Sequence, residues 1–469
     1  MPPLTDSTTL QDSLPHLAAS TDLASLPAGR KIGFVHLGCA KNLVDTETML
    51  GLLAKDGHTL VQDETEADVV LVNTCAFIEK AQEESVEALA TLAEQGKKLL
   101  ITGCLAQKFQ GELLDLFPEA EAVVGIDQVP DIASIVRQTS QGERVLAVQQ
   151  DPTFLLEEDH VRQHVTLGPW VYLKIAEGCD YRCTFCIIPS MRGDFRSRPI
   201  ANVVENARQL VASGARELIL VGQDTTSYGK DHGETLAQLL YALNEIKDLQ
   251  WIRILYAYPT NVTDDLLKAF AECEKVVKIL DCPLQHSHPE MLKRMGRPIN
   301  DLADFAQRVR GAVPGIRLRS TFIVGFPGET EAHVQHLIET LQSVKFDRVG
   351  VFEYSDVDTA ASQHLDGKVA KREIKQRRSR VMAAQQTVSY ELHQALVGQI
   401  LPVMIDLVRE NGLLQGRTQW DAPEVDPVVT VKVPKTHMSG ELMPGQIAQV
   451  SISGATPYDL RGVLETPPS

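Results

Sequence analysis

The sequence has no long uninterrupted hydrophobic run and few cysteines for its length. Charged residues interrupt every apolar stretch before it reaches the ~18 residues that a membrane-spanning helix needs, and residues 1–29 contain no Lys or Arg. We therefore expect no membrane span and no secretory signal, which needs both a basic and an apolar region. Eight cysteines in 469 residues are too few for a disulfide scaffold, so we expect reduced thiols in a cytoplasmic protein.

Basic residues are also in deficit. The chain has 45 Lys and Arg against 62 Asp and Glu, a formal net charge of −17, which repels polyphosphate at long range and favours a basic partner. A hydrophobic fraction of 43% and a charged fraction of 23% are ordinary for a globular protein. A length of 469 residues exceeds what one core usually organises, so we expect several domains.

Apolar strands alternate with helical stretches in two series. The first series, within residues 30–150, predicts a doubly wound parallel sheet with helices on both faces. The second series, within 169–397, predicts a partial (β/α)6 barrel, whose active site is expected at the C-terminal strand ends. Its candidate strands are 171–175, 217–221, 251–256, 276–280, 317–324 and 348–352.

Three further segments complete the expected organisation of this α/β chain. Residues 1–29 are interpreted as a disordered tail, and the polar stretch 151–168 as a linker. Beyond residue 398, short alternating runs are separated by Gly, Pro and Asn. This pattern predicts a small antiparallel β-barrel over 398–467.

Three cysteines, Cys179, Cys183 and Cys186, directly follow a predicted strand. The C-x3-C-x2-C spacing lets three thiolates bind three corners of a [4Fe–4S] cluster and leaves the fourth iron without a protein ligand. Such an open iron can chelate the amino and carboxylate groups of S-adenosylmethionine (SAM). The alternatives are a zinc knuckle or three incidental buried thiols, but zinc sites normally need four ligands and no fourth Cys or His lies close in the sequence.

This triplet resembles the signature of the radical SAM superfamily, with an aromatic residue before the last cysteine. The segment 222–224 follows the next strand, where the superfamily contacts the methionine end of SAM, and 323–328 resembles the segment that lines the adenine. Glycines at strand ends are also ordinary turn residues, so each short motif is weak alone. The resemblance implies SAM contacts by Phe185, Gly222, Gln223, Asp224, Gln285, Ile323, Gly325 and Phe326.

Another three cysteines are dispersed along the first βα series. Cys39, Cys75 and Cys104 each lie just past the C-terminal end of a predicted parallel strand. Those strand ends form the crevice where open α/β sheets bind ligands, so three thiolates can converge there. The alternative is coincidence among buried cysteines. Gly38 and Gly103 precede two of them and would let the backbone approach a ligand closely.

The arrangement resembles the methylthiotransferase family, which has an N-terminal three-cysteine domain, a central radical SAM domain and a C-terminal TRAM domain. The resemblance covers about residues 30–467. It implies that Cys39, Cys75 and Cys104 hold an auxiliary [4Fe–4S] cluster, the second of two, that carries or supplies the transferred sulfur. Cys273 and Cys282 have no counterpart role and are interpreted as packing residues.

Two branches of the family differ in substrate: one modifies adenosine in transfer RNA, the other the β-carbon of an aspartate in the twelfth protein of the small ribosomal subunit. The segments 37–45, 73–78, 186–189 and 283–286 resemble the second branch. Residues 399–469 contain eight acidic and five basic side chains. This excess of acidic groups disfavours binding of nucleic acid, because proteins bind its phosphates through Lys and Arg. We expect the ribosomal protein as substrate, with transfer RNA as the alternative and RNA contact not primary.

A basic run at 368–380 is interpreted as a solvated helix face rather than a nucleic-acid patch. Arg192, Arg196 and Arg198, after the cysteine triplet, either bind a carboxylate of SAM or of the substrate, or form ion pairs at the strand ends. The resemblance also implies the reaction. One SAM methylates sulfur at the auxiliary cluster, another gives the radical that removes hydrogen from the aspartate β-carbon, and a flavodoxin or ferredoxin supplies electrons.

Overall fold

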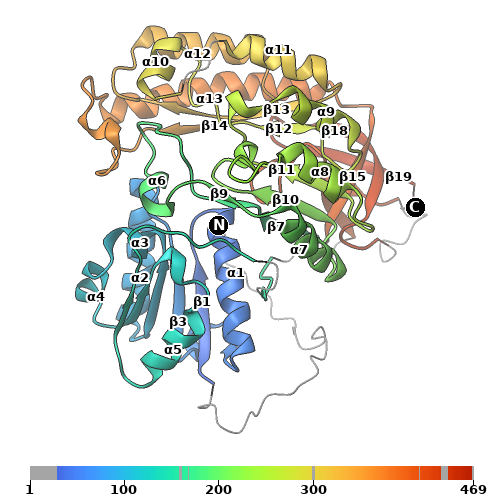
Figure 1. Ribbon diagram of the computed structural model, residues 1–469. Coiled ribbons are helices and arrows are strands. Elements are labelled where there is room, and N and C mark those ends of the chain that lie inside the picture. The colour runs from blue at the N-terminus through green and yellow to red at the C-terminus, as the bar shows by residue number, and fades with distance from the viewer. Residues whose placement is uncertain are drawn as a thin grey trace.

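The computed structural model describes residues 29–157, 161–166, 168–297, 301–410, 412–434 and 442–466. Almost all of the expected tail, residues 1–28, lies outside the described residues. Figure 1 shows three parts in chain order: a sheet flanked by helices, a curved array of strands with helices outside it, and a small barrel at the C-terminal end. The exact boundaries of the five expected segments stay a prediction of the sequence.

The first part is a six-stranded parallel sheet in the order β2-β1-β3-β4-β5-β6. Helices cover both faces, because the strands bury apolar side chains toward two separate hydrophobic clusters. The predicted doubly wound sheet is thus confirmed. Its strands are β1 Lys31–His36, β2 Thr59–Leu60, β3 Val69–Thr74, β4 Leu99–Gly103, β5 Ala120–Val124 and β6 Val145–Ala147. Its helices are α1 Ala40–Lys55, α2 Glu79–Glu94, α3 Cys104–Phe109, α4 Glu112–Leu116 and α5 Ile132–Ser140.

The second part has six parallel strands in two hydrogen-bonded groups, β7-β10-β11 and β12-β13-β14. A single bridge between Ile252 and Val276 joins the groups, so the expected partial barrel is confirmed. The strands are β7 Trp170–Lys174, β10 Glu217–Val221, β11 Trp251–Ile254, β12 Ile279–Asp281, β13 Arg317–Val324 and β14 Arg348–Glu353. A short antiparallel pair, β8 Ala176–Glu177 and β9 Arg196–Ser197, flanks the cysteine loop.

Helices pack on the outside of this barrel, where apolar residues from strands and helices form one large core. The long helices of this part are α7 Ile200–Ala212, α8 Leu236–Asn244, α9 Asp264–Glu272, α11 Leu302–Ala312, α12 Glu331–Val344 and α13 Lys371–Gln394. Two short ones, α6 Ile188–Arg192 and α10 Pro289–Arg294, follow the cysteine loop and β12. The 3-10 helices are η3 Glu64–Glu66, η4 Ile126–Gln128, η5 Thr225–Ser227, η6 Pro259–Asn261 and η7 Ala361–His364.

The third part is a closed five-stranded barrel in the order β15-β16-β17-β19-β18. The expected barrel is present, but one neighbouring pair, β17 and β19, is parallel. A ring with an odd number of strands cannot alternate direction throughout, so one pair must run the same way. The strands are β15 Ile400–Val408, β16 Leu413–Thr418, β17 Val429–Lys432, β18 Ile447–Ala455 and β19 Leu460–Thr466.

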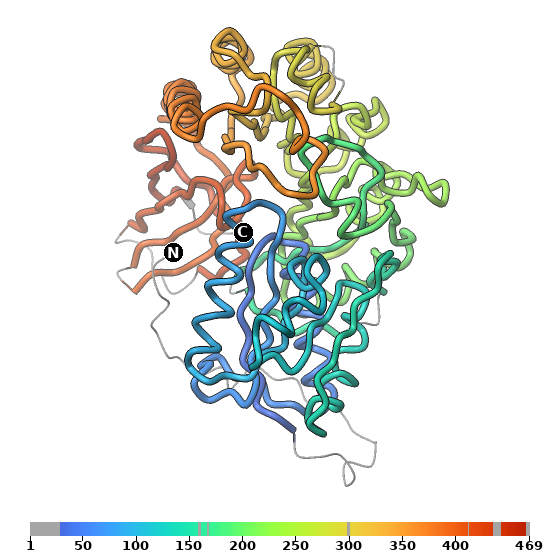
Figure 2. Tube along the Cα trace, turned by 90° about the vertical axis from the view of Figure 1, so that its left-hand side faces the viewer, coloured from blue at the N-terminus to red at the C-terminus, as the bar shows by residue number. Residues whose placement is uncertain are grey.

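Polar contacts fix this small barrel against the N-terminal ends of the central strands. Arg348 at the start of β14 donates to Asp421 at 2.5 Å, and Arg253 of β11 donates to the Gln419 carbonyl at 3.0 Å. Figure 2 shows the small barrel beside the central strands, with the N-terminal sheet below both. The opposite, C-terminal strand ends therefore face the N-terminal sheet.

The described part of the expected linker lies against the N-terminal sheet. The backbone N–H groups of Thr153 and Phe154 donate to the Asp127 carboxylate, both at 2.8 Å to Oδ1. Arg162 pairs with Glu47 of α1 at 2.5 Å. None of the helices within the described residues is long and apolar enough to cross a membrane.

Candidate active site

The loop that carries Cys179, Cys183 and Cys186 turns tightly after β8. Gly178 has φ +76°, and a Cβ there would lie 2.0 Å from the Asp194 carbonyl oxygen, so only glycine fits. The Cys179 N–H donates to the Gly193 carbonyl at 3.2 Å, and Cys186 donates to the Cys183 carbonyl at 3.0 Å. These contacts fold the three cysteines into one compact loop.

The electrostatics of this loop suit a cationic group. Burial raises the pKa of Cys179 to about 11 and that of Cys186 to about 12, and each thiolate would repel Cys183. Arg297 lies 3.7 Å from the Cys183 sulfur through its Nη1 atom. Thiols that repel one another when ionised become metal ligands once a cation binds them. Three sulfurs from one loop therefore fit a cubane with one open iron.

The structure also brings together the three dispersed cysteines. Cys39 precedes α1, Cys75 follows β3 and Cys104 begins α3, so all three lie at the C-terminal edge of the sheet. Gly38 has φ +103°, and a Cβ at this position would lie 3.3 Å from the Cys75 sulfur. Gly103 has φ +87°, and a Cβ at this position would lie 2.1 Å from Asn73 Oδ1. Both glycines thus let neighbouring protein atoms approach the backbone, while approach to a ligand stays a prediction.

The three thiols lie close enough to act on one another's ionisation. Burial raises the pKa of Cys75 to about 11, and repulsion by Cys104 and Cys39 adds to that shift. Burial also opposes ionisation of Cys39, but the Lys41 and Arg192 cations outweigh it and lower the pKa of this thiol. Three mutually repelling thiols beside cations form a donor set that fits a second three-ligand cluster.

Arg192 connects the two cysteine groups. It lies at the end of α6, six residues after Cys186, and is fully buried. Its guanidinium donates to Asn42 Oδ1 at 2.5 Å and approaches the Cys104 sulfur to 3.7 Å. It also donates to Glu177 Oε1 at 2.8 Å. Ion pairing is therefore the role that the structure gives Arg192, whereas Arg196 and Arg198 donate to backbone and amide oxygens.

Gln223 and Asp224 lie at the end of β10, close to the cysteine loop. Gln223 donates to Glu177, and its Oε1 is buried without a hydrogen bond among the described residues. Asp224 caps η5 by accepting from the Thr226 N–H at 2.9 Å. Gly222, beside them, would place a Cβ 3.4 Å from Ala176. The amide oxygen of Gln223 thus lacks a hydrogen-bond partner within the described residues, whereas Asp224 is satisfied by its own turn.

The remaining expected SAM contacts lie along β13 and the strand end beside it. Gln285, at φ +75°, pairs with Phe322 through a parallel bridge, and its carbonyl accepts from the Ile323 N–H at 2.7 Å. Gly325 has φ +77°, and its N–H donates to Glu329 at 2.7 Å. Phe326 is fully buried. An apolar cluster gathers three of the predicted residues with four neighbours: Phe185, Ile323, Phe326, Met291, Met295, Tyr354 and Leu365.

Sequence reasoning missed the buried polar groups between the two cysteine sites. Lys174 donates to Asp45 and, at 2.7 Å, to Glu177. Lys41 places its ammonium 3.5 Å from the ring centroid of Tyr256. A signal was available, because Lys174 ends an otherwise apolar strand and Glu177 directly precedes the cysteine loop. Burial of α1 on nearly all sides was not visible from its polar composition.

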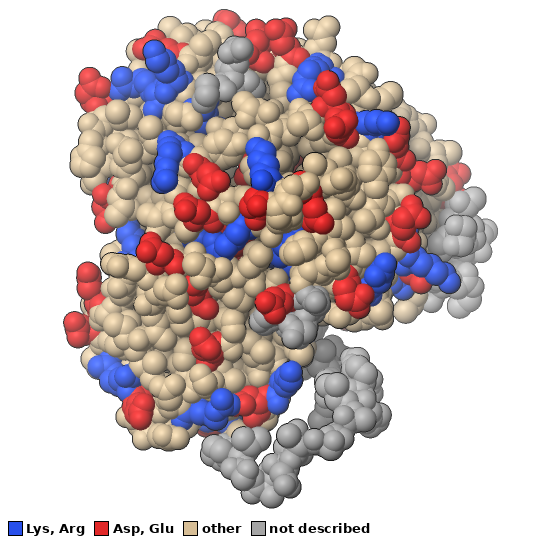
Figure 3. Space-filling model, viewed as in Figure 1, with Lys and Arg blue, Asp and Glu red and all other residues tan. Residues whose placement is uncertain are grey.

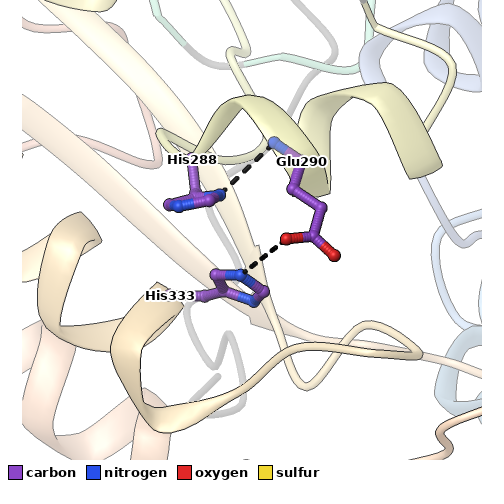
Figure 4. Close-up of side chains that lie close together, drawn as sticks. All are labelled: His288, Glu290 and His333. Atoms are coloured by element: carbon purple, nitrogen blue, oxygen red, sulfur yellow. Dashed lines mark hydrogen bonds and ion pairs between the residues drawn. The ribbon is translucent and has the colours of Figure 1, made fainter.

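A second group of potential metal ligands lies outside this region. Figure 4 shows His288, Glu290 and His333, whose candidate ligand atoms lie within 4.8 Å of one another. However, Nδ1 of His288 accepts from the Glu290 N–H at 3.3 Å, and Nδ1 of His333 accepts from the Thr330 N–H at 3.1 Å. Each imidazole therefore carries its proton on Nε2, which leaves no free lone pair for a metal. The group is a helix-capping arrangement of α10 and α12.

Two other features behave as the sequence suggested. Cys273 and Cys282 are buried in the large hydrophobic core of the central barrel. The basic side chains at 368–380 are exposed, as expected for a solvated helix face, except for Arg377, which is buried against Glu329 at 2.6 Å; the exposed Arg380 pairs with Glu331 at 2.6 Å. Positive and negative side chains are interspersed on the face shown in Figure 3. These pairs reduce the net positive charge that the run could offer to a nucleic acid.

Three family models match the chain in succession. Residues 31–125 match Uncharacterized protein family UPF0004, residues 173–341 match the Radical SAM superfamily, and residues 397–464 match the TRAM domain. Radical SAM domains use SAM and a [4Fe–4S] cluster. These models cover the three parts of the fold in the same order.

Solved structures share the fold at low sequence identity. The radical S-adenosylmethionine methyltransferase TsrM from Kitasatospora setae, with tryptophan substrate and a SAM analogue bound, aligns with a TM-score of 0.53 at 14% identity. That alignment covers 77% of this chain and 89% of TsrM. This likeness concerns the fold of the chain.

Curated relatives are much more similar. The chain is 48% identical over 440 residues to "Ribosomal protein uS12 methylthiotransferase RimO" of Microcystis aeruginosa, covering 92% of this chain and 98% of that protein. It is 47% identical over 449 residues to the RimO protein of Synechococcus sp. (strain CC9605), covering 94% and 97%. The chain therefore belongs to the RimO family of ribosomal protein uS12 methylthiotransferases.

Proposed function

We propose that this chain adds a methylthio group to the β-carbon of an aspartate in ribosomal protein uS12. The observation that carries this proposal is the pairing of two three-cysteine sites across one buried junction, joined by Arg192. The names of the relatives supply the substrate. One cysteine group alone would suffice for SAM cleavage, so a second group facing it calls for a reaction that needs two clusters.

We assign one [4Fe–4S] cluster to the loop cysteines and a second to the dispersed ones. Cys179, Cys183 and Cys186 would hold the first, and Cys39, Cys75 and Cys104 the second. When bound, the first cluster and SAM supply one-electron cleavage of the sulfonium, which gives a radical able to break the C–H bond of an unactivated carbon. No acid or base of the protein could remove that hydrogen as a proton at neutral pH.

The protein itself would orient the cysteine loop and SAM and would exclude water from the site. Glu177 ties the loop to the end of β10 because it accepts from Lys174 and Arg192, and both cations hold the pKa of Glu177 well below its usual value despite burial. Gln223, bound to Glu177, keeps an amide oxygen without a hydrogen-bond partner among the described residues, and this oxygen would accept from the amino group of SAM. Gln285, Ile323, Gly325, Phe326 and Phe185 would line the rest of the SAM site.

Partners and location follow from the substrate. A ribosomal protein is basic, which suits the net charge of −17, and its modification would take place in the cytoplasm. The reaction needs an external electron donor, for which a flavodoxin or ferredoxin is suitable. RNA contact would be secondary.

Anaerobic reconstitution tests the proposal directly. The chain, loaded with iron and sulfide and reduced with dithionite, is incubated with methyl-deuterated SAM and a uS12 peptide that contains the target aspartate. We expect a mass gain of one deuterated methylthio group on that aspartate, together with 5′-deoxyadenosine. Modification of transfer RNA adenosine in place of the peptide, or full iron loading without 5′-deoxyadenosine, would overturn the proposal.

A further inference from the structure

Lys41 is a buried cation beside the dispersed cysteines. It lies in the first turn of α1, two residues after Cys39, and is 8% exposed. Its ammonium lies over the ring of Tyr256, which follows β11 of the central barrel. Lys41 and Tyr256 thus meet across the junction between the N-terminal sheet and the mouth of the barrel.

The cations around Lys41 form ion pairs with carboxylates, whereas Lys41 forms none within the described residues, although the Cys39 thiol and Glu177 act on its charge from nearby. Lys174 is paired with Asp45 and Glu177, and Arg192 is paired with the same two carboxylates. The contact that the structure gives the Lys41 ammonium is the face of Tyr256. This aromatic face attracts a cation but offers no anionic charge. The ammonium of Lys41 thus makes no direct ion pair, and its N–H donors can bind an anion that enters the junction.

The backbone of Tyr256 is held in an unusual conformation that keeps its ring at this place. Its φ is +62°, a left-handed value that is uncommon for a bulky residue. Its N–H donates to Asp281 Oδ2 at 2.8 Å, and its carbonyl accepts from the Thr225 N–H at 3.2 Å. Such strain persists where the surrounding structure enforces it, and it concentrates at functional sites.

We propose that Lys41 is the specificity-determining residue that binds the side-chain carboxylate of the substrate aspartate, an inference that rests on the proposed function. The carboxylate is attached directly to the carbon that loses hydrogen. An ammonium that binds it would hold this carbon between the two cysteine groups. It would also discriminate against asparagine, which has the same shape but no charge.

The alternative role for Lys41 is charge compensation of the neighbouring cysteine sulfurs. The two roles differ in one measurable quantity, the preference for aspartate over asparagine. A residue that only balances the charge of a cluster changes the rate for both peptides equally. A residue that binds the substrate carboxylate changes the ratio of their kcat/KM values.

The test compares two uS12 peptides, with Asp or Asn at the target position, on the reconstituted full chain. We expect the unmodified chain to prefer the Asp peptide by roughly 100-fold in kcat/KM, the scale of a desolvated charge pair. Lys41→Met should reduce this preference to a few-fold, and Lys41→Arg, which keeps the charge, should recover most of it. Lys55→Met, an exposed lysine at the other end of α1, should retain the full preference.

Iron content and the low-temperature EPR spectrum of each variant show that both clusters are loaded, which excludes misfolding as the cause. A Lys41→Met chain that is fully loaded and retains the 100-fold preference would overturn the inference and leave the proposed function standing. If the unmodified chain modifies neither peptide, the proposed function fails and the role of Lys41 fails with it.

Discussion

The two cysteine groups of this chain are built in opposite ways. Cys179, Cys183 and Cys186 lie within one loop of eight residues, whereas Cys39, Cys75 and Cys104 come from three separate strand ends. In the loop, local hydrogen bonds and one glycine set the geometry. At the strand ends, the register of a parallel sheet sets it. Sequence spacing reveals the first kind of site, and only topology reveals the second.

The largest expected effects come from removing one sulfur from each group. Cys183→Ser should abolish both 5′-deoxyadenosine formation and methylthio transfer, because the loop cysteines are assigned to SAM cleavage. Cys75→Ser should abolish transfer but leave reductive SAM cleavage, because the dispersed cysteines are assigned to the sulfur. Chromatography of 5′-deoxyadenosine and peptide mass spectrometry check both outcomes. If Cys75→Ser also abolished SAM cleavage, the functional separation of the two groups would be wrong.

Breaking the link between the groups should cost stability. Arg192→Met leaves the buried Asp45 and Glu177 with one cation fewer, and removing one partner of a buried pair typically destabilises by about 3–5 kcal/mol. Urea unfolding of the chain checks this. The matched control is Arg208→Met, since the Arg208 pair with Glu205 is exposed, and its effect should stay within about 0.5 kcal/mol. Equal effects for the two variants would contradict a buried link.

Glu47 tests how the linker is docked on α1, the helix that begins after Cys39. Its pKa is lowered to about 2, because hydrogen bonds and charge interactions with His164 and Arg162 outweigh its burial. A depressed pKa contributes stability above the unfolded value, about 4.3, that is lost as pH falls through about 2. The shift corresponds to about 3 kcal/mol.

Glu47→Gln should therefore lose most of this stability at pH 7 and flatten the acid limb of the pH–stability curve between about pH 4 and 2. Chemical denaturation over that range measures it. Glu64→Gln is a suitable control, since Glu64 is a half-buried residue of the same sheet domain and forms no ion pair within the described residues. An unchanged acid limb in Glu47→Gln would show that the linker is held by other contacts.

Replacement of Gly103, beside the dispersed cysteines, is expected to have the smallest effect on stability among these predictions. It distinguishes backbone strain at a positive φ from a steric clash of the new side chain. Gly103→Ala should destabilise by about 1–2 kcal/mol for its positive φ, and further because the new Cβ would lie 2.1 Å from Asn73 Oδ1. Gly142→Ala is the matched control: its φ is +89°, but nothing lies within 4 Å of its Cβ. Thermal unfolding should show the larger loss for Gly103→Ala. Equal losses would mean that this glycine serves conformation alone.

The sequence predicted the overall fold because apolar periodicity follows burial in each element. The break between α3 and α4 was not visible in the sequence, because it depends on Gln110, which adopts φ +49° and ends α3. The sequence pattern did not single out β2, β5 or β6, of which β2 and β6 are too short to show a pattern. At the site, the six cysteines were visible from motif and context, although their ligand roles stay predictions.

The buried polar network was not predictable in the same way. Arg192 meets Asn42, 150 positions away in sequence, and Lys174 meets Asp45 across 129. Such contacts depend on how two separate sheets face each other, which no local pattern encodes. The role of Lys41 was not predictable for the same reason. It depends on contact with Tyr256 in the central barrel and on the ion pairs of the neighbouring Lys174 and Arg192.

Mössbauer spectroscopy of the anaerobically reconstituted chain, combined with iron and sulfide analysis, tests the central claim most directly. The account predicts about eight iron and eight sulfide ions per chain, all in [4Fe–4S] form. It predicts about four of each after Cys39, Cys75 and Cys104 are replaced together by alanine. A chain that holds only four iron ions, with a content unchanged by that triple replacement, would contradict a second cluster at the strand ends.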